Sequence, residues 1–120
     1  MNAVISKPYN LEERTVSFAE RIVQLCKKSP KNYITAPIID QLIRAGTSIG
    51  ANYSEATGAS SKRDFINKVF VCKKEAIETK YWLRLLSKAE EKMAQDCRVL
   101  WREAQELTLI FSKIAGKSRK

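Results

Sequence analysis

Basic side chains in the second half of the chain are the residues best suited to chemistry, and that chemistry is contact with phosphate. Lys73, Lys80 and Arg84 are spaced seven and four residues apart, which places them on one line of a helix. Lysine contacts phosphate as a point charge and adds affinity without reading sequence. We therefore predict a nucleic-acid-binding surface made of Lys62, Lys73, Lys80, Arg84 and Lys88. The alternative is a solvated basic face that has no ligand.

The charge balance favours the same type of ligand. The 120 residues include 22 basic and 13 acidic residues, which give a net charge of +9. Residues 62–120 alone hold 15 basic and 8 acidic residues, a net charge of +7. A small domain this basic often meets a polyanion, most often nucleic acid.

The sequence lacks the residues that catalytic and metal-binding sites usually contain. The chain has no histidine, which is the commonest general base and metal ligand. Cys26, Cys72 and Cys97 are widely spaced and form no CxxC pair, so we expect buried thiols in a reducing compartment and no zinc site. We predict no catalytic residue, no metal, no cofactor and no enzymatic activity.

The chain also lacks the signals of a membrane or secreted protein. No apolar run approaches the ~18 residues of a membrane span. The first ten residues do not resemble a secretory signal. These features predict a cytoplasmic location with no membrane partner.

Four stretches have the apolar periodicity of amphipathic helices. The first begins at Leu11, and the second opens near Pro37 and ends at Gly58. The third spans about residues 61–90, with Ser60 or Ser61 as its cap. The fourth opens at Asp96 as N-cap and is expected to end at Gly116.

Short links between the four helices predict an all-α protein with an up-down-up-down four-helix bundle. The bundle domain covers residues 11–115, between a flexible N-terminal arm (1–10) and a basic tail (116–120). Gly46 and Gly50 share the core-facing side of the second helix. Because mid-helix glycine costs ~1 kcal/mol relative to alanine, the pair predicts a close helix crossing.

The third helix has a second apolar set besides its core stripe: Ile66, Phe70, Ile77 and Tyr81. This set predicts either a broad core or contact with another subunit. Nearby aromatic residues, Tyr81, Trp82 and Trp101, are suited to base stacking, but burial in the bundle or in a subunit interface is the favoured interpretation.

The segment from Gln41 to Val69 resembles the signature of the 23S rRNA intervening-sequence proteins, a ribosomal protein-like family. The matching residues are Gln41, Leu42, Arg44, Ala45, Ser48, Ile49, Asn52, Glu55 and Phe65. Ala56 departs from the pattern, since the family usually has glycine there. The resemblance covers about residues 11–114.

The resemblance implies a four-helix bundle that assembles into a ring, commonly a homopentamer, and it attaches no catalytic activity. The accessory protein of diversity-generating retroelements is similar in fold, and it binds nucleic acid and a reverse transcriptase. Such a protein partner is therefore also implied.

A polar set on the second helix lies opposite its apolar stripe: Arg44, Ser48, Asn52 and Glu55. One interpretation is a solvated face. The other is a polar seam between subunits, in which Glu55 pairs with Arg44 of a neighbour or with a base on its own third helix. With the second apolar set of the third helix, this polar set makes up the predicted oligomer interface.

Two functions follow from the sequence. The first is a non-enzymatic oligomer that binds nucleic acid, with RNA preferred, as an adaptor or accessory protein. The alternative is a ring scaffold for protein interactions that has no direct role with nucleic acid.

Overall fold

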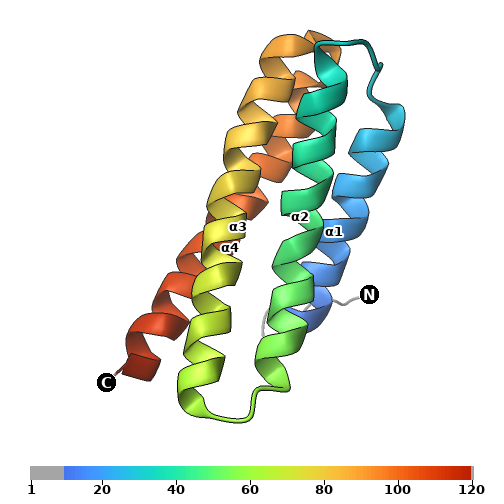
Figure 1. The fold of residues 1–120 in the computed structure, drawn as a ribbon. Helices are drawn as coiled ribbons and strands as arrows, with labels where there is room; N and C mark the ends of the chain where they lie inside the picture. Colours follow the sequence, from blue (N-terminus) through green and yellow to red (C-terminus); the bar gives the residue numbers. More distant parts are fainter. Residues whose placement is uncertain (1–9, 120) are drawn as a thin grey trace, which may run out of the picture.

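A computed structural model describes residues 10–119, and within this range the chain is all-helical. The elements are α1 (Leu11–Lys28), α2 (Thr35–Thr57), α3 (Lys62–Ala89), the short 3-10 helix η1 (Glu91–Met93) and α4 (Ala94–Arg119). Consecutive long helices run in opposite directions (Figure 1). The predicted up-and-down four-helix bundle is therefore confirmed, while the predicted N-terminal arm lies almost entirely outside the described residues.

The bundle is flattened, with extents of 45 × 34 × 19 Å. α3 packs broadly against both α2 and α4, and α1 packs against α2. α1 and α4 contact each other much less, so they form the open side of the bundle. Three ion pairs join them there: Arg14 Nε lies 2.7 Å from Glu103 Oε2, Arg14 Nη2 lies 2.6 Å from Glu106 Oε1, and Lys28 Nζ lies 2.7 Å from Asp96 Oδ2.

Local capping hydrogen bonds determine where the helices start, and most starts agree with the predicted residues. The side chain of Asn10 accepts a hydrogen bond from Glu13 N at the start of α1, and Ser61 accepts one from Asp64 N at the start of α3. α2 begins at Thr35, two residues before Pro37, because the Asn32 side chain accepts hydrogen bonds from the backbone of Thr35 and its neighbour.

The predicted ends of α4 are wrong. The helix begins at Ala94 because η1 leads directly into it, so Asp96 lies in the first turn and not at the N-cap. An acidic residue there still suits the helix dipole, and Asp96 pairs with Lys28. Gly116 does not end the helix, which continues to Arg119. Gly116 is exposed and helical, so it lowers helix propensity without forcing a stop.

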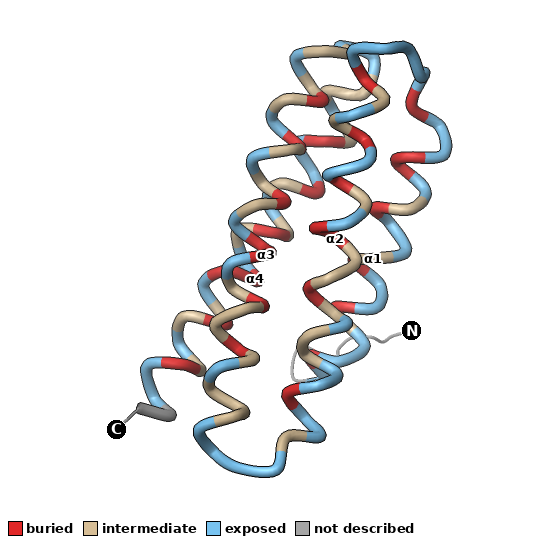
Figure 2. Tube along the Cα trace, viewed as in Figure 1, coloured by how far each residue is buried: buried red, intermediate tan, exposed pale blue. Residues whose placement is uncertain are grey.

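The core runs along the bundle axis, where buried positions face inward on every long helix (Figure 2). Its largest fully buried side chains include Phe18, Ile22, Leu42, Ile49, Leu83, Leu107 and Phe111. The close crossing predicted at Gly46 is present between α1 and α2. A Cβ added there would lie 2.9 Å from Cγ1 and Cγ2 of Ile22.

The three cysteines are buried free thiols in the core, as predicted. Burial raises the pKa of Cys26 to about 11 and the pKa values of Cys72 and Cys97 to about 12. Because only the thiolate is nucleophilic, these side chains are inert in the folded protein at pH 8. We expect no reaction with a thiol reagent such as dithionitrobenzoate until the protein is unfolded in denaturant. Rapid labelling of the native protein would contradict this burial.

None of the helices between residues 10 and 119 combines the length and the apolar character that a bilayer crossing requires.

Candidate nucleic-acid interface

A groove lies between α3 and the first turns of α4, and arginine side chains surround it. Its volume is about 270 Å³. The lining residues are Leu83, Arg84 and Ser87 of α3, with Ala94, Cys97, Arg98, Trp101 and Arg102 of α4. Leu83 and Cys97 are buried, whereas the three arginines are exposed. We call this feature the α3–α4 groove.

The positive charge of the α3–α4 groove is not neutralised by an ion pair within the described part of the chain. Among residues 10–119, no carboxylate pairs with Arg84, Arg98 or Arg102. Arg98 Nη1 donates to Gln95 Oε1 at 2.6 Å, which orients the guanidinium and leaves its charge intact. Arginine offers five donors in a planar fork that matches phosphate. The groove is therefore suited to bind a phosphate group.

Lys80 is held against α4 beside the groove. Its ammonium donates to Gln105 Oε1 and lies 5.3 Å from the ring centre of Trp101. It adds charge to the site from a fixed position and is not a free solvated lysine. Trp101 is half-buried against the core, in agreement with the favoured packing interpretation.

The structure brings together only part of the predicted basic surface. Lys80, Arg84 and Lys88 lie at the end of α3 that borders the groove. Lys73 instead lines a shallow hollow with Phe70, Lys74 and Ile77. Lys62 lies 22 residues before Arg84, which is about 33 Å along the helix axis.

Arg98 and Arg102 complete the groove and were missed by the sequence reasoning. They are spaced four residues apart in α4, so the sequence does place them on one helix face. Their position beside Arg84 depends on how α4 is rotated and shifted against α3. That relation is set by tertiary packing and is not visible in either helix alone.

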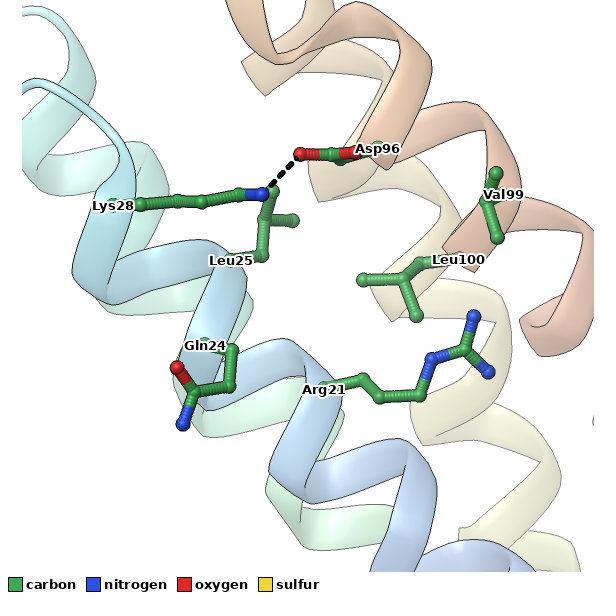
Figure 3. A pocket seen from close by; sticks show the side chains of 7 residues that line it. All are labelled: Arg21, Gln24, Leu25, Lys28, Asp96, Val99 and Leu100. Carbon is green, nitrogen blue, oxygen red and sulfur yellow. Dashed lines mark ion pairs between the residues drawn. The ribbon is translucent and has the colours of Figure 1, made fainter.

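A second cleft lies on the open side of the bundle between α1 and α4 (Figure 3). Its volume is about 210 Å³, and Leu25, Val99 and Leu100 supply its apolar wall. Lys28 and Asp96 pair across it, so part of its charge is already neutralised. This cleft is therefore less suited to a polyanion than the α3–α4 groove.

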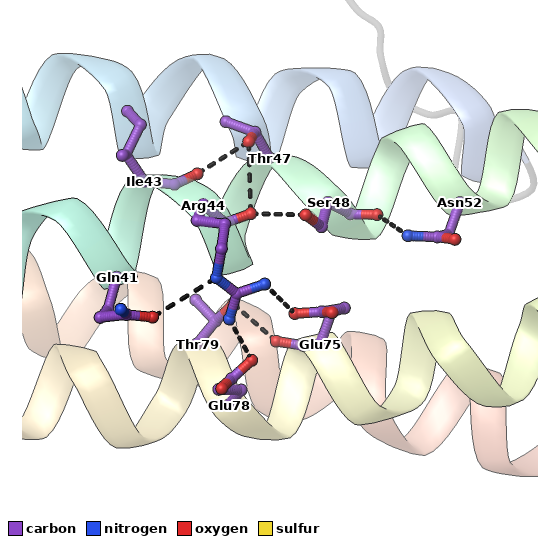
Figure 4. Close-up of polar contacts among 9 residues, drawn as sticks. All are labelled: Gln41, Ile43, Arg44, Thr47, Ser48, Asn52, Glu75, Glu78 and Thr79. Atoms are coloured by element: carbon purple, nitrogen blue, oxygen red, sulfur yellow. Dashed lines mark hydrogen bonds and ion pairs between the residues drawn. The ribbon is translucent and has the colours of Figure 1, made fainter.

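The predicted polar set of α2 makes contacts within the chain (Figure 4). Arg44 reaches across to α3, where Nη1 lies 3.4 Å from Glu75 Oε1 and Nη2 pairs with Glu78. The Ser48 hydroxyl donates to the carbonyl of Arg44 at 2.6 Å, and Asn52 donates to the carbonyl of Ser48 at 2.8 Å.

Glu55 pairs with a base on its own third helix, one of the two predicted alternatives. That base is Lys68, whose Nζ donates to Glu55 Oε1 at 2.6 Å. No second subunit is needed to explain these contacts, and the interface role of the polar set stays a prediction.

The two carboxylates under Arg44 have pKa values shifted in opposite directions. Burial raises the pKa of Glu75, and the neighbouring Glu78 adds to that effect while Arg44 opposes it. The hydrogen bond from Arg44 lowers the pKa of Glu78. Among the described residues, no group of three or more His, Cys, Asp or Glu side chains is placed to hold a metal ion.

The model of the 23S rRNA-intervening sequence protein family matches residues 9–113, which is most of the chain. The chain belongs to this family. A crystal structure of a protein of unknown function from the S23 ribosomal protein family of Bacteroides thetaiotaomicron is similar to it. The identity is 36% and the TM-score is 0.80, over 88% of this chain and 97% of that chain. Comparison with curated proteins finds no match.

The geometry explains several residues by which this chain resembles the intervening-sequence proteins. Arg44 and Glu55 form ion pairs with α3, whereas Ser48 and Asn52 donate to backbone carbonyls of α2 itself. Of the matching polar residues, Arg44 and Glu55 therefore act in helix pairing.

The outer face of α3 combines the second apolar set with the predicted basic line. At 100° per residue, both sets fall within an arc of about 100°. Ile77 is 47% exposed and Tyr81 is 55% exposed, whereas Ile66 and Phe70 are half-buried. Apolar and basic residues interleave along this face: Lys62 and Lys73 lie near Ile66 and Phe70, and the exposed Ile77 and Tyr81 lie in the half nearer η1 with Lys80, Arg84 and Lys88.

Proposed function

We propose that this intervening-sequence protein binds nucleic acid at the α3–α4 groove as a non-enzymatic adaptor. The observation that carries the proposal is the convergence of Arg84, Arg98 and Arg102 on one groove without an acidic partner in the described part of the chain. Lys80 and Lys88 extend the positive surface along α3. Contacts of this type act on the phosphate backbone and give affinity without sequence preference.

RNA is the nucleic acid to test first. The family description refers to an intervening sequence of 23S rRNA, and this supports an RNA ligand for the present chain. The arginine groove is compatible with either RNA or DNA, because phosphate is common to both.

The proposal is tested by replacing the three arginines together with glutamine. We expect Arg84→Gln/Arg98→Gln/Arg102→Gln to weaken binding of a single-stranded RNA about tenfold at low salt, because three phosphate contacts are lost. Fluorescence anisotropy of a labelled oligonucleotide measures this change. Circular dichroism should show unchanged helicity, since all three side chains are exposed.

A matched control removes the same charge elsewhere. Arg21, Lys27 and Arg63 are exposed and lie outside the groove, so their joint replacement with glutamine lowers the net charge equally. We expect the control to retain binding within about threefold. Equal losses in both triple variants would contradict a defined site and indicate non-specific attraction to the net charge.

We propose further that the protein forms a homo-oligomer, a pentamer as the family resemblance implies, through the second apolar set on the outer face of α3. Ile77→Glu is expected to dissociate it with helicity retained, because a charge would be buried in the subunit contact. Ile77 is a cleaner choice than Phe70, which also packs against the bundle core.

Light scattering that gives a 13.7 kDa monomer for the wild type would contradict the proposal. An oligomer that binds no nucleic acid would support the alternative of a protein-interaction ring.

A further inference from the structure

Tyr81 differs from the two tryptophans near the groove. Trp82 and Trp101 are half-buried and pack against the core, whereas Tyr81 is 55% exposed on the outer face of α3. It lies one helical turn before Arg84 and two turns before Lys88. Residues three and four apart on a helix are surface neighbours, so Arg84 adjoins the ring on one side, while Glu78, which is paired with Arg44, adjoins it on the other.

The ring of Tyr81 is held in place and remains accessible. Its centroid lies 4.9 Å from that of Trp82, and the two planes meet at 80°. In an edge-to-face pair of this type, Trp82 covers at most one face of the tyrosine ring. The other face is available to a planar ligand, and the contact limits the movement of the ring.

We propose that Tyr81 stacks an unpaired base of a nucleic acid whose phosphates contact Arg84 and Lys88, so that the interface prefers single strands over duplexes. This inference rests on the proposed function and names the form of the ligand. Proteins that bind single strands usually combine cationic side chains along the nucleic-acid backbone with aromatic rings on which the bases stack.

A duplex cannot use the ring in the same way. Its bases are already paired and stacked inside the helix, and the protein meets mainly phosphates and sugars. The arginines of the α3–α4 groove serve both forms, whereas Tyr81 adds affinity only for unpaired bases. The contribution of the ring is therefore separable from that of the charge.

The test compares Tyr81→Leu with the wild type on two probes, an oligouridine of about 12 nucleotides and an oligoadenosine–oligouridine duplex of the same length. We expect the variant to bind the single strand about tenfold more weakly, which is within the range for loss of one stacked base. Duplex binding should change less than about twofold. Tyr81→Phe keeps the ring and should retain single-strand binding.

Different results separate this inference from the proposed function. If Tyr81→Leu binds the single strand as the wild type does, or loses affinity for both probes equally, the stacking proposal is wrong. Binding at the α3–α4 groove is still supported in that case if the triple arginine variant loses affinity. If the wild type binds neither probe at low salt, both proposals fail. Light scattering is run on each variant, because Tyr81 also belongs to the predicted oligomer interface. Loss of assembly together with loss of single-strand binding would overturn the stacking role.

Discussion

Replacing Gly46 with leucine is expected to lower the free energy of unfolding by about 3 kcal/mol or more, or to prevent folding. Gly46 is buried where α2 crosses α1. Even a Cβ would lie 2.9 Å from two carbon atoms of Ile22, which is itself fully buried. A leucine would push the two helices apart along the core. Thermal and urea denaturation measure the loss.

Gly116 provides the control for this prediction. It also lies within a helix, but a Cβ added there meets nothing within 4 Å. Gly116→Leu should leave stability unchanged or raise it slightly, because only helix propensity changes. A higher melting temperature for Gly46→Leu would overturn the close crossing of α1 and α2.

Replacing Arg44 with methionine is expected to reduce stability by about 2–3 kcal/mol at neutral pH, because it removes the cation that pairs with a buried carboxylate. The Glu75 side chain is only 10% exposed, and Arg44 is its cationic partner across the α2–α3 contact. Methionine keeps most of the length of the side chain, so the effect reports mainly the charge. Urea denaturation at several pH values measures it.

The cost of Arg44→Met should grow as the pH rises. The pKa of Glu75 is raised in the folded protein, so its contribution to folding stability is largest at low pH and falls as the pH increases above the ordinary carboxyl range. Without Arg44 the pKa of Glu75 rises further, so stability falls more steeply with pH in the variant. Glu78, whose pKa Arg44 lowers, also loses stabilisation that is present only at the higher pH. The free energy of unfolding of the variant should therefore be close to that of the wild type near pH 4 and differ from it most near pH 7.

Lys68→Met is the matched control, since it breaks an ion pair with Glu55 across the same two helices at the surface. Exposed pairs contribute little, so its melting temperature should change far less than that of Arg44→Met. An Arg44→Met variant with the same stability as the wild type at pH 7 would contradict the role of this arginine in helix pairing.

The fold could be predicted from the sequence because local signals agree along the chain. Apolar periodicity places four helices, Ser61 caps α3, and the spacing of Gly46 and Gly50 indicates the close crossing that is present. The start of α4 could not be placed in the same way. Asp96 has the side chain of an N-cap, but η1 supplies the turn that leads into the helix two residues earlier.

The candidate site was only half predictable, because it joins two helices. Arg84 and Lys88 follow from the pattern of α3 alone, whereas Arg98 and Arg102 reach the groove through the packing of α4 on α3. Lys80 fits the same helical line but is turned toward Gln105 and Trp101 by that packing. Helix periodicity gives the direction of a side chain and not the surface that it meets.

The most direct test of nucleic-acid binding at the α3–α4 groove is the salt dependence of binding to a single-stranded RNA oligonucleotide. Each phosphate contact contributes about −0.7 to the slope of log K against log salt concentration for single strands. Contacts by Arg84, Arg98 and Arg102 therefore predict a wild-type slope of about −2 or steeper. In the triple glutamine variant the slope should be shallower by about 2. A wild-type protein that binds no RNA at low salt, or a slope that the triple variant leaves unchanged, would contradict the account.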